Sequence, residues 1–168
     1  MLTRAVRLAA IAALTIAVAA CSTTPNPDST AAAGFGAGGA GGVATPGSAQ
    51  DFTVNVGDRV FFDSDSTDLT PTAVATLDKQ AQWLARYPRY TILIEGHADE
   101  RGTREYNFSL GARRGQTVRD YLASRGVAGT RMRTVSYGKE RPVAVCNDIS
   151  CWSQNRRAVT VLEQGAGV

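Results

Sequence analysis

The chain has 168 residues, of which 43% are hydrophobic and 20% charged, and its formal net charge is +3 at pH 7. Two of its 18 basic residues, Arg4 and Arg7, lie in an N-terminal segment that we expect to be removed, so the mature chain holds 16 basic and 15 acidic residues. A chain so close to neutral lacks the electrostatic basis for binding nucleic acid, although the whole sequence has an isoelectric point near 9.0.

Residues 1–20 have the pattern of a secretory signal peptide. The two arginines precede an apolar run at residues 8–20, whose 13 residues are too few for a membrane-spanning helix. The run ends in Val18-Ala19-Ala20-Cys21, and small residues before a cysteine resemble the bacterial lipobox, in which the cysteine is lipidated and becomes the new N-terminus. A plain signal peptide with a chance cysteine is the alternative.

The residue after Cys21 bears on localisation. In lipoproteins of enteric type an aspartate at this position retains the protein in the inner membrane, whereas this chain has Ser22. The resemblance therefore predicts a protein held in the outer membrane of the cell by its lipid anchor, with its domain facing the periplasm. Several acyl chains on one residue anchor firmly, because each buried methylene contributes about 0.8 kcal/mol.

Residues 21–50 comprise Cys21 and a linker. The run at residues 31–42 is nearly all Gly and Ala, and it has neither an amphipathic period nor core-forming content. As a flexible coil, the segment after the cysteine would span roughly 30 Å, and about 100 Å at full extension. We therefore expect a tether that lets a folded domain reach away from the membrane.

Residues 51–168 are long enough for one domain with its own core. We expect a first strand at residues 60–62, begun as early as residues 52–54, and then a helix that starts at Thr70, with Pro71 in its first turn, and stops before Pro88. A strand at residues 90–95 and a helix at 105–125, closed by Gly126, follow. The last expected strands are at residues 134–137 and 158–162. Strands separated by helices predict an α/β layered domain with some parallel pairing.

The second expected helix carries an arginine among apolar neighbours. At 100° per residue, one sector of about 120° holds Asn107, Leu110, Arg114, Val118, Tyr121 and Leu122. Arg113 points about 100° away from this stripe. A charge on the core-facing side of a helix needs a partner, because an unpaired buried ion is unfavourable. Arg114 is therefore the candidate for function, and Arg113 the candidate for a solvated surface.

Asp99 lies in the acidic loop before this helix and can converge with Arg114 on one pocket. Helix N-termini also favour anions. One interpretation is a preformed site for a zwitterion, which one carboxylate and one guanidinium hold at a fixed separation. The other is a plain Asp99–Arg114 salt bridge that fixes the loop, and spacing alone does not decide between them.

Residues 51–168 resemble the OmpA C-terminal domain and, within that family, the peptidoglycan-associated lipoproteins of the Tol–Pal system. The matching segments cover nearly the whole domain in order and spacing: Val60-Phe61-Phe62-Asp63 with Asp65 and Asp68, Glu95-Gly96-His97-Ala98-Asp99-Glu100-Arg101-Gly102-Thr103, Glu105-Tyr106-Asn107, Ser109-Leu110-Gly111, Arg113-Arg114, Val135-Ser136-Tyr137-Gly138-Lys139-Glu140, Pro142, and Asn155-Arg156-Arg157-Ala158-Val159. The resemblance implies a two-layer α/β (α+β) sandwich of βαβαβ(α)β order, with a mixed sheet packed on helices.

The function that this resemblance implies is noncovalent binding of peptidoglycan through the meso-diaminopimelate of its stem peptide, which tethers the outer membrane to the cell wall. The two central residues of the family fall on Asp99 and Arg114. Diaminopimelate ends in an ammonium and a carboxylate on one carbon, which suit these two side chains.

The resemblance adds four residues to the candidate site: Asp65, Thr103, Asn107 and Leu110. Backbone N–H groups near Thr103 would supply further donors. For Asp65 the alternative is capping of the helix that follows it. For Asn107 the alternative is satisfaction of backbone groups near the helix start.

The resemblance also implies partners. Domains of this kind bind the TolB-like β-propeller and act with the other Tol proteins in envelope integrity and in outer-membrane constriction at cell division. A flagellar stator protein of the same superfamily would need an uncleaved transmembrane helix, and Cys21 argues against one. No cofactor is implied.

Cys146 and Cys151 depart from the enteric pattern of the family. An oxidising periplasm favours a disulfide that closes a short loop. A C-x4-C metal half-site is the rival, but no second Cys or His cluster is present to complete it.

Other departures concern the helix and the turn before it. Gly115 replaces the usual alanine, and Ser64 and Ser66-Thr67 replace bulkier turn residues. A glycine inside a helix costs up to about 1 kcal/mol, unless it lets backbone pack closely. The turn residues affect the rim of the pocket rather than its centre.

Two other classes of function compete with binding. Glu95, His97, Asp99 and Glu100 would suit a hydrolase of peptidoglycan, but the chain has one histidine and no nucleophile paired with a base. The pattern Asp63-x-Asp65-x-x-Asp68 would suit calcium, but it lacks the glycine and bidentate glutamate of a twelve-residue calcium loop. We therefore expect a binding protein rather than an enzyme, with no metal and a structural role for His97.

Overall fold

The computed structural model of the protein describes residues 44–164. The signal peptide expected at residues 1–20, the lipidation expected at Cys21 and most of the tether lie outside these residues. Within the described range, none of the helices combines the length and the apolar character that crossing a membrane requires.

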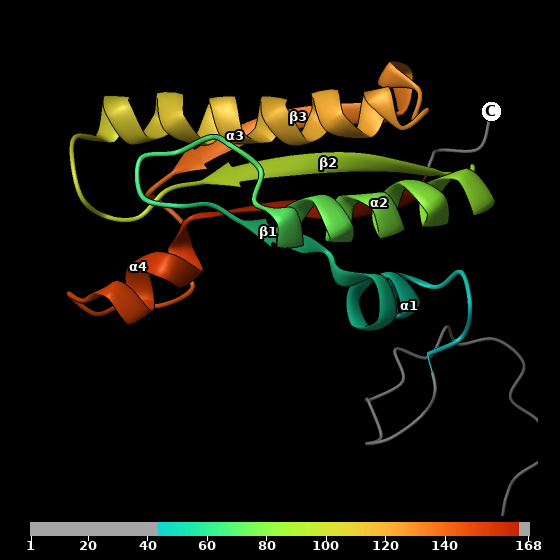
Figure 1. Cartoon of the computed structure of the whole chain (residues 1–168), viewed down its shortest axis with the longest axis horizontal. Coiled ribbons are helices and arrows are strands. Elements are labelled where there is room, and N and C mark those ends of the chain that lie inside the picture. The colour runs from blue at the N-terminus through green and yellow to red at the C-terminus, as the bar shows by residue number, and fades with distance from the viewer. Residues whose placement is uncertain (1–43, 165–168) are drawn as a thin grey trace, which may run out of the picture. The chain divides into compact units, whose positions relative to one another are not determined.

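The domain is built on a mixed sheet of four strands (Figure 1). The strands are β1 (Arg59–Phe61), β2 (Tyr90–His97), β3 (Met132–Gly138) and β4 (Arg157–Gln164), in the spatial order β1-β4-β2-β3. β2 pairs in parallel with β3, while β4 runs antiparallel to both β1 and β2. The expected fold class and its parallel pairing are confirmed.

Two long helices, α2 (Pro71–Arg86) and α3 (Arg104–Ser124), pack on the sheet (Figure 1). Along β2, Tyr90, Ile92 and Ile94 are buried while the residues between them are only partly buried, which is the pattern of a strand with one face toward the core. The core joins this face to the helices through Leu77, Leu84, Val118 and Leu122.

Both helices start at threonine caps, of which the sequence predicts the one at Thr70. The side chain of Thr70 accepts the backbone N–H of Ala73 at 3.2 Å at the start of α2. Thr103 caps α3 in the same way, accepting the N–H of Tyr106 at 3.2 Å. Gly126, just beyond α3, has a φ of 92°, in the left-handed region where glycine is favoured.

The strand expected at residues 52–54 is wrong. Residues Phe52–Gly57 form a π-helical turn (η1) that continues the short helix α1 (Ala49–Asp51). Phe52 is buried and Val56 packs against the same core, so the apolar contacts recur at a spacing of four, which suits a helix and not a strand. A further short helix, α4 (Ile149–Asn155), precedes β4 at the place of the bracketed helix in the expected order.

The folded part of the chain begins before the expected boundary at residue 51. The carbonyl of Gly47 accepts hydrogen bonds from the Tyr90 hydroxyl at 2.9 Å and from the Arg89 guanidinium at 2.8 Å. Asp51 accepts the indole N–H of Trp83 at 2.8 Å. These bonds hold residues 44–51, the N-terminal strap, on the domain. Composition gives no sign of the strap, because much of its binding runs through its backbone.

Two glycines let α3 lie directly on β2. A Cβ at Gly96 would lie 1.8 Å from the carbonyl oxygen of Gly111, and a Cβ at Gly111 would lie 2.5 Å from the hydroxyl of Ser136. At Gly115 the nearest atom, the carbonyl oxygen of Ile94, would be 3.7 Å away, which is an ordinary contact. The close packing considered for Gly115 therefore occurs at Gly111, one turn earlier.

We expect opposite effects from two alanine substitutions on α3. Gly111→Ala should destabilise the domain by roughly 1–3 kcal/mol, because a methyl group there forces α3 away from β2. Gly115→Ala should stabilise it by up to about 1 kcal/mol, because it removes a glycine from a helix interior that has room for a methyl group. Urea unfolding of both variants measures the two differences. Destabilisation by Gly115→Ala would contradict the assignment of the close contact to Gly111.

Candidate functional site

A cavity of about 260 Å³ opens between the β1–α2 loop, the β2–α3 loop and α3. Its lining residues are Ser64, Asp65, Asp99, Arg101, Gly102, Tyr106, Asn107, Leu110 and Arg114. Five of the six candidate ligand-binding residues are among them, and the sixth, Thr103, caps α3 beside the lining residue Gly102. A larger cavity of about 630 Å³ lies between α3 and the end of β3, but its lining includes neither Asp99 nor Arg114.

Arg114 is fully buried, and three backbone carbonyls hold its guanidinium. Its Nε–H donates to Ser66 at 2.9 Å, and its two terminal nitrogens donate to His97 at 2.9 Å and to Asp63 at 3.0 Å. Burial lowers the pKa of Arg114 to about 10, with the charge of Asp99 acting in the opposite direction, so the side chain stays protonated at neutral pH.

The two neighbouring arginines of α3 differ as helical phase predicts. Arg114 faces the interior, whereas Arg113 is exposed. The interpretation as a direct Asp99–Arg114 salt bridge is wrong, because the ion pairs of Asp99 run to Arg101 and Arg156 instead. The cavity therefore holds a buried carboxylate and a buried guanidinium that are not bonded to each other.

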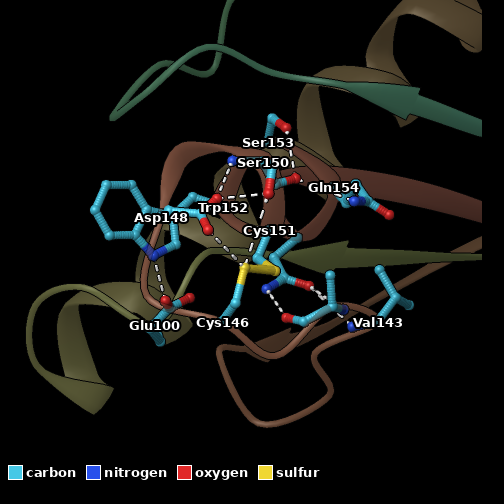
Figure 2. The surroundings of a disulfide bond; sticks show 11 residues. Glu100, Val143, Cys146, Asp148, Ser150, Cys151, Trp152, Ser153 and Gln154 are labelled. Atoms are coloured by element: carbon cyan, nitrogen blue, oxygen red, sulfur yellow. Dashed lines mark hydrogen bonds between the residues drawn. A yellow bond between two sulfur atoms is a disulfide. The ribbon is translucent and has the colours of Figure 1, made fainter.

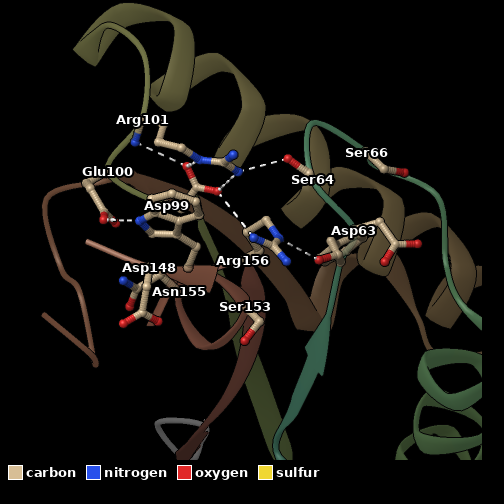
Figure 3. A network of polar contacts seen from close by, with 12 residues as sticks. Asp63, Ser64, Ser66, Asp99, Glu100, Arg101, Asp148, Ser153, Asn155 and Arg156 are labelled. Carbon is tan, nitrogen blue, oxygen red and sulfur yellow. Dashed lines mark hydrogen bonds and ion pairs between the residues drawn. The ribbon is translucent and has the colours of Figure 1, made fainter. Parts of the chain in front are cut away.

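Asp99 is 6% exposed and lies at the centre of a polar network (Figure 3). One carboxylate oxygen is 2.6 Å from a terminal nitrogen of Arg101 and 3.4 Å from one of Arg156. Burial raises the pKa of this carboxyl, but hydrogen bonds from the side chain and backbone of Arg101, together with Arg156, outweigh burial and hold the pKa below its usual range. Asp99 is therefore ionised at neutral pH.

Sequence reasoning missed the roles of Arg101 and Arg156. Arg101 stands two residues after Asp99, and a basic residue so close to an acidic one in the same loop is the signal that would have found it. Arg156 is 57 residues from Asp99 in the sequence and becomes its neighbour only through the fold. Position alone gives no sign of that contact.

The remaining candidate residues have defined partners. Asp65 has a φ of 56°, and its carboxylate accepts a hydrogen bond from the hydroxyl of Tyr106. The alternative role of Asp65 as the cap of the following helix is wrong, because Thr70 caps α2. Asn107 is 2% exposed and donates to the carbonyl of Arg101 at 2.6 Å. Asn107 thus satisfies backbone near the helix start, as its alternative states, and also lines the cavity.

His97 is 1% exposed and lies outside the cavity lining. Burial, followed by the charges of Arg157 and Arg141, lowers its pKa to about 4, although a carboxylate oxygen of Glu95 lies 3.5 Å from its Nε2. Its ring is tilted against Tyr137 with centroids 5.6 Å apart, and its backbone carbonyl accepts from Arg114. A neutral, buried ring in this position supports a structural role for His97 rather than a role as a catalytic base.

Cys146 and Cys151 are joined in a disulfide, with their Cα atoms 5.6 Å apart (Figure 2). Because each sulfur is bonded to the other, neither is free to bind a metal as the rival interpretation requires. Within residues 44–164, no cluster of three or more His, Cys, Asp or Glu side chains has a geometry that could hold a metal ion.

Comparison with known proteins identifies relatives of this chain. The model of the OmpA family matches residues 61–156. The peptidoglycan-associated lipoprotein of Rhizobium meliloti is 77% identical over 126 residues, which cover 75% of this chain and 71% of that protein. The protein of the same name from Pseudomonas aeruginosa is 50% identical over 97 residues, covering 58% of this chain and 57% of that protein.

Solved structures match the same region. The crystal structure of the peptidoglycan-associated lipoprotein from Burkholderia pseudomallei is 41% identical with a TM-score of 0.65, covering 68% of this chain and 98% of that one. Nearly the whole of that crystallised chain is thus matched by part of this one. The C-terminal domain of Helicobacter pylori MotB, 22% identical with a TM-score of 0.60 over 65% of this chain and 86% of that one, shares the fold.

The buried neutral His97 should make stability depend on pH. Its pKa is about 4 in the folded protein and about 6.5 in the unfolded chain. Between these values the unfolded chain binds more protons, so stability is complete above about pH 6.5 and falls as the pH drops toward 4. The expected loss between pH 7 and pH 5 is about 2 kcal/mol in the free energy of unfolding.

Urea unfolding at several pH values measures this loss, and NMR titration of the histidine ring measures the folded-state pKa directly. Because the chain has one histidine, the ring signal is unambiguous. A titration midpoint near 6.5, the ordinary value for histidine, would contradict the prediction.

Proposed function

The chain belongs to the OmpA family and, within it, to the peptidoglycan-associated lipoproteins, and we propose that its cavity binds the meso-diaminopimelate of the peptidoglycan stem peptide noncovalently. The observation that carries this proposal is the pair of opposite charges, Asp99 and Arg114, which the cavity holds without joining them. The far end of diaminopimelate carries an ammonium and a carboxylate, so one ligand group supplies a partner for each.

In this proposal Arg114 binds the carboxylate of the ligand. A guanidinium has five N–H groups, and the bonds to Ser66, His97 and Asp63 use three of them. One N–H remains on each terminal nitrogen, which matches the two oxygens of a carboxylate. The three backbone bonds also fix the guanidinium before the ligand arrives, so little side-chain entropy is lost on binding.

Asp99 accepts the ammonium of the ligand from the other side of the cavity. Leu110 contributes an apolar wall for the methylene chain of diaminopimelate, and Asn107 holds the acidic loop through the carbonyl of Arg101. Asp65 lines the rim, where Tyr106 fixes its carboxylate, and the backbone near Thr103 adds N–H donors at the start of α3. Each side chain thus has a separate part in positioning one ligand.

One stem-peptide site of this size binds modestly, because each charge-assisted hydrogen bond contributes about 1.5–3 kcal/mol. The wall presents many copies of the ligand, and the membrane presents many copies of the protein. Multivalency then supplies the strength of attachment without further contacts. We therefore propose binding rather than hydrolysis as the function of the domain.

The remainder of the proposal concerns location and partners. Residues 1–20 are cleaved, Cys21 carries the lipid, and residues 21–43 with the strap connect the outer membrane to a periplasmic domain. The TolB-like β-propeller and the other Tol proteins act with this domain in envelope integrity and in constriction of the outer membrane at division. The names of the close relatives and the OmpA family match support this placement.

We expect Asp99→Asn and Arg114→Lys each to reduce binding to diaminopimelate-containing sacculi at least about tenfold. Asp99→Asn removes the negative charge that pairs with the ammonium, and Arg114→Lys removes the planar group that donates two bonds to the carboxylate, so each loses about one charge-assisted hydrogen bond. Both changes keep the size of the side chain. Arg114→Ala is a weaker test, because it leaves three buried carbonyls without a donor and threatens the fold. Co-sedimentation of the domain from residue 44 with purified sacculi measures the effect.

Arg113→Ala is the matched control, since it removes an exposed arginine from the neighbouring position and should leave binding unchanged. Thermal unfolding of each variant checks that the fold is retained. Undiminished binding by both Asp99→Asn and Arg114→Lys would exclude this cavity as the binding site. Release of soluble fragments from sacculi by the parent domain would support a hydrolase instead.

The lipid anchor has its own test. Labelled palmitate should enter the full-length protein when it is expressed in a Gram-negative host, and Cys21→Ala should abolish the incorporation, because the thiol of that residue is the acceptor. Fluorography of the immunoprecipitated protein measures both. Label in the Cys21→Ala variant would exclude the lipobox interpretation.

A further inference from the structure

The carboxylate of Asp99 is already saturated with hydrogen-bond donors. One oxygen accepts the backbone N–H of Arg101 at 3.1 Å and its Nε–H at 3.2 Å. The other accepts from a terminal nitrogen of Arg101 at 2.6 Å and from one of Arg156 at 3.4 Å. A carboxylate has about four acceptor positions, so all of them are in use. A ligand ammonium therefore cannot bind Asp99 until one donor leaves.

Only one of these donors is free to leave. The Arg156 side chain is 8% exposed and also donates to the carbonyl of Phe62 at 3.1 Å. The loop backbone is fixed, because Lys139 donates to the carbonyl of Gly102 at 2.7 Å. The Arg101 side chain is 43% exposed, so its guanidinium can rotate into solvent without moving the loop.

Two contacts outside the ion pair keep Arg101 on Asp99. The hydroxyl of Ser64 accepts from the Arg101 guanidinium at 2.8 Å (Figure 3). The same guanidinium lies 4.3 Å from the centre of the Trp152 ring, a cation–π arrangement. Ser64 is one of the positions at which this chain departs from the bulkier residues of the family pattern, and its hydroxyl is the acceptor for Arg101.

Trp152 is itself held in place by α4 and by the loop before it. Its indole N–H donates to the carboxylate of Glu100. Helix α4 has seven residues, too few for stability alone. The Cys146–Cys151 disulfide ties its first turn to the preceding loop (Figure 2), and Asn155 ties its last turn to the same loop through the backbone of Ala144. The ring of Trp152 is thus a fixed platform for Arg101.

We propose that Arg101 is a specificity-determining residue that covers the Asp99 carboxylate and gives way only to a ligand that carries an ammonium. Its guanidinium occupies the position on Asp99 that the ammonium of the ligand takes. A ligand without an ammonium that displaced the Arg101 side chain would leave the buried carboxylate with only the longer contact to Arg156 and the backbone N–H of Arg101, which is unfavourable. We call the Arg101–Asp99 ion pair the latch. The contacts of Arg101 with Ser64 and Trp152 set how stable it is. This inference rests on the proposed function.

The test compares Arg101→Ala with Arg104→Ala in the domain from residue 44. Arg104 is an exposed arginine that pairs with Glu140 at 3.1 Å, so its removal changes the net charge equally without touching Asp99. NMR titration measures the affinity of each variant for meso-diaminopimelate and for pimelate, the same dicarboxylate without ammonium groups.

Arg101→Ala should bind diaminopimelate about fivefold more tightly than the parent, because the ligand no longer competes with a partly exposed ion pair. It should gain nothing for pimelate. Trp152→Ala should shift the affinity for diaminopimelate in the same direction by a smaller factor. Trp152→Phe, which keeps an aromatic face but lacks the N–H that donates to Glu100, should give a value between those of Trp152→Ala and the parent. Arg104→Ala should not tighten binding. Weaker or equal binding of diaminopimelate by Arg101→Ala would overturn the latch.

A second measurement does not depend on the ligand. The side-chain carboxyl of Asp99 is titrated by ¹³C NMR in the same variants, and Arg101→Ala should raise its pKa while Arg104→Ala leaves it in place. If the parent fails to bind diaminopimelate but this pKa rises, the proposed function fails and the closure of Asp99 by Arg101 stands. If the parent binds and the pKa does not move, the latch is overturned and the proposed function stands.

Discussion

The geometry of this domain depends on one buried arginine. Arg114 reaches from α3 to the carbonyl at the end of β2 and to two carbonyls of the β1–α2 loop, so a single side chain joins three segments that are distant in the sequence. The charge is tolerated in the interior because every one of these bonds goes to a well-oriented acceptor. The contact is available only because Gly96 and Gly111 let α3 approach β2 without intervening side chains. Packing of the backbone and placement of the charge are therefore two aspects of the same constraint.

Around this centre the protein keeps opposite charges close but apart. Asp99 is neutralised by Arg101 and Arg156 rather than by Arg114, and Arg114 is satisfied by carbonyls rather than by a carboxylate. A direct Asp99–Arg114 pair would have closed the cavity, and a zwitterion would have had to break that pair in order to bind. Separate partners keep the two charges apart at a cost in desolvation that the hydrogen bonds offset. In the proposed function, a ligand ammonium then has only the partly exposed Arg101 side chain to displace from Asp99.

Much of this arrangement follows from local sequence rules. The caps at Thr70 and Thr103 satisfy N–H groups a few residues away, and helical phase separates Arg114 from Arg113 because both signals are local. The partners of Arg114 could not be predicted, since a backbone carbonyl has the same identity at every residue. Arg156 meets Asp99 only after β4 has taken its place beside β2. The π-helical turn at Phe52–Gly57 could not be predicted either, because its apolar residues are too few to distinguish the spacing of four of a helix from the spacing of two of a strand.

The N-terminal strap and the cavity lie at opposite ends of strand β2. Gly47 is fastened beside Tyr90, where β2 begins, whereas the cavity lies beyond His97, where β2 ends. In the proposed function, tension between membrane and wall enters at one end of this strand and leaves at the other, so it acts along the strand axis. β2 is hydrogen-bonded on both sides, to β4 and to β3, and these bonds run across the line of force. The load would then be shared in shear by two ladders at once instead of peeling one bond after another, an orientation suited to a chain that has to withstand pulling.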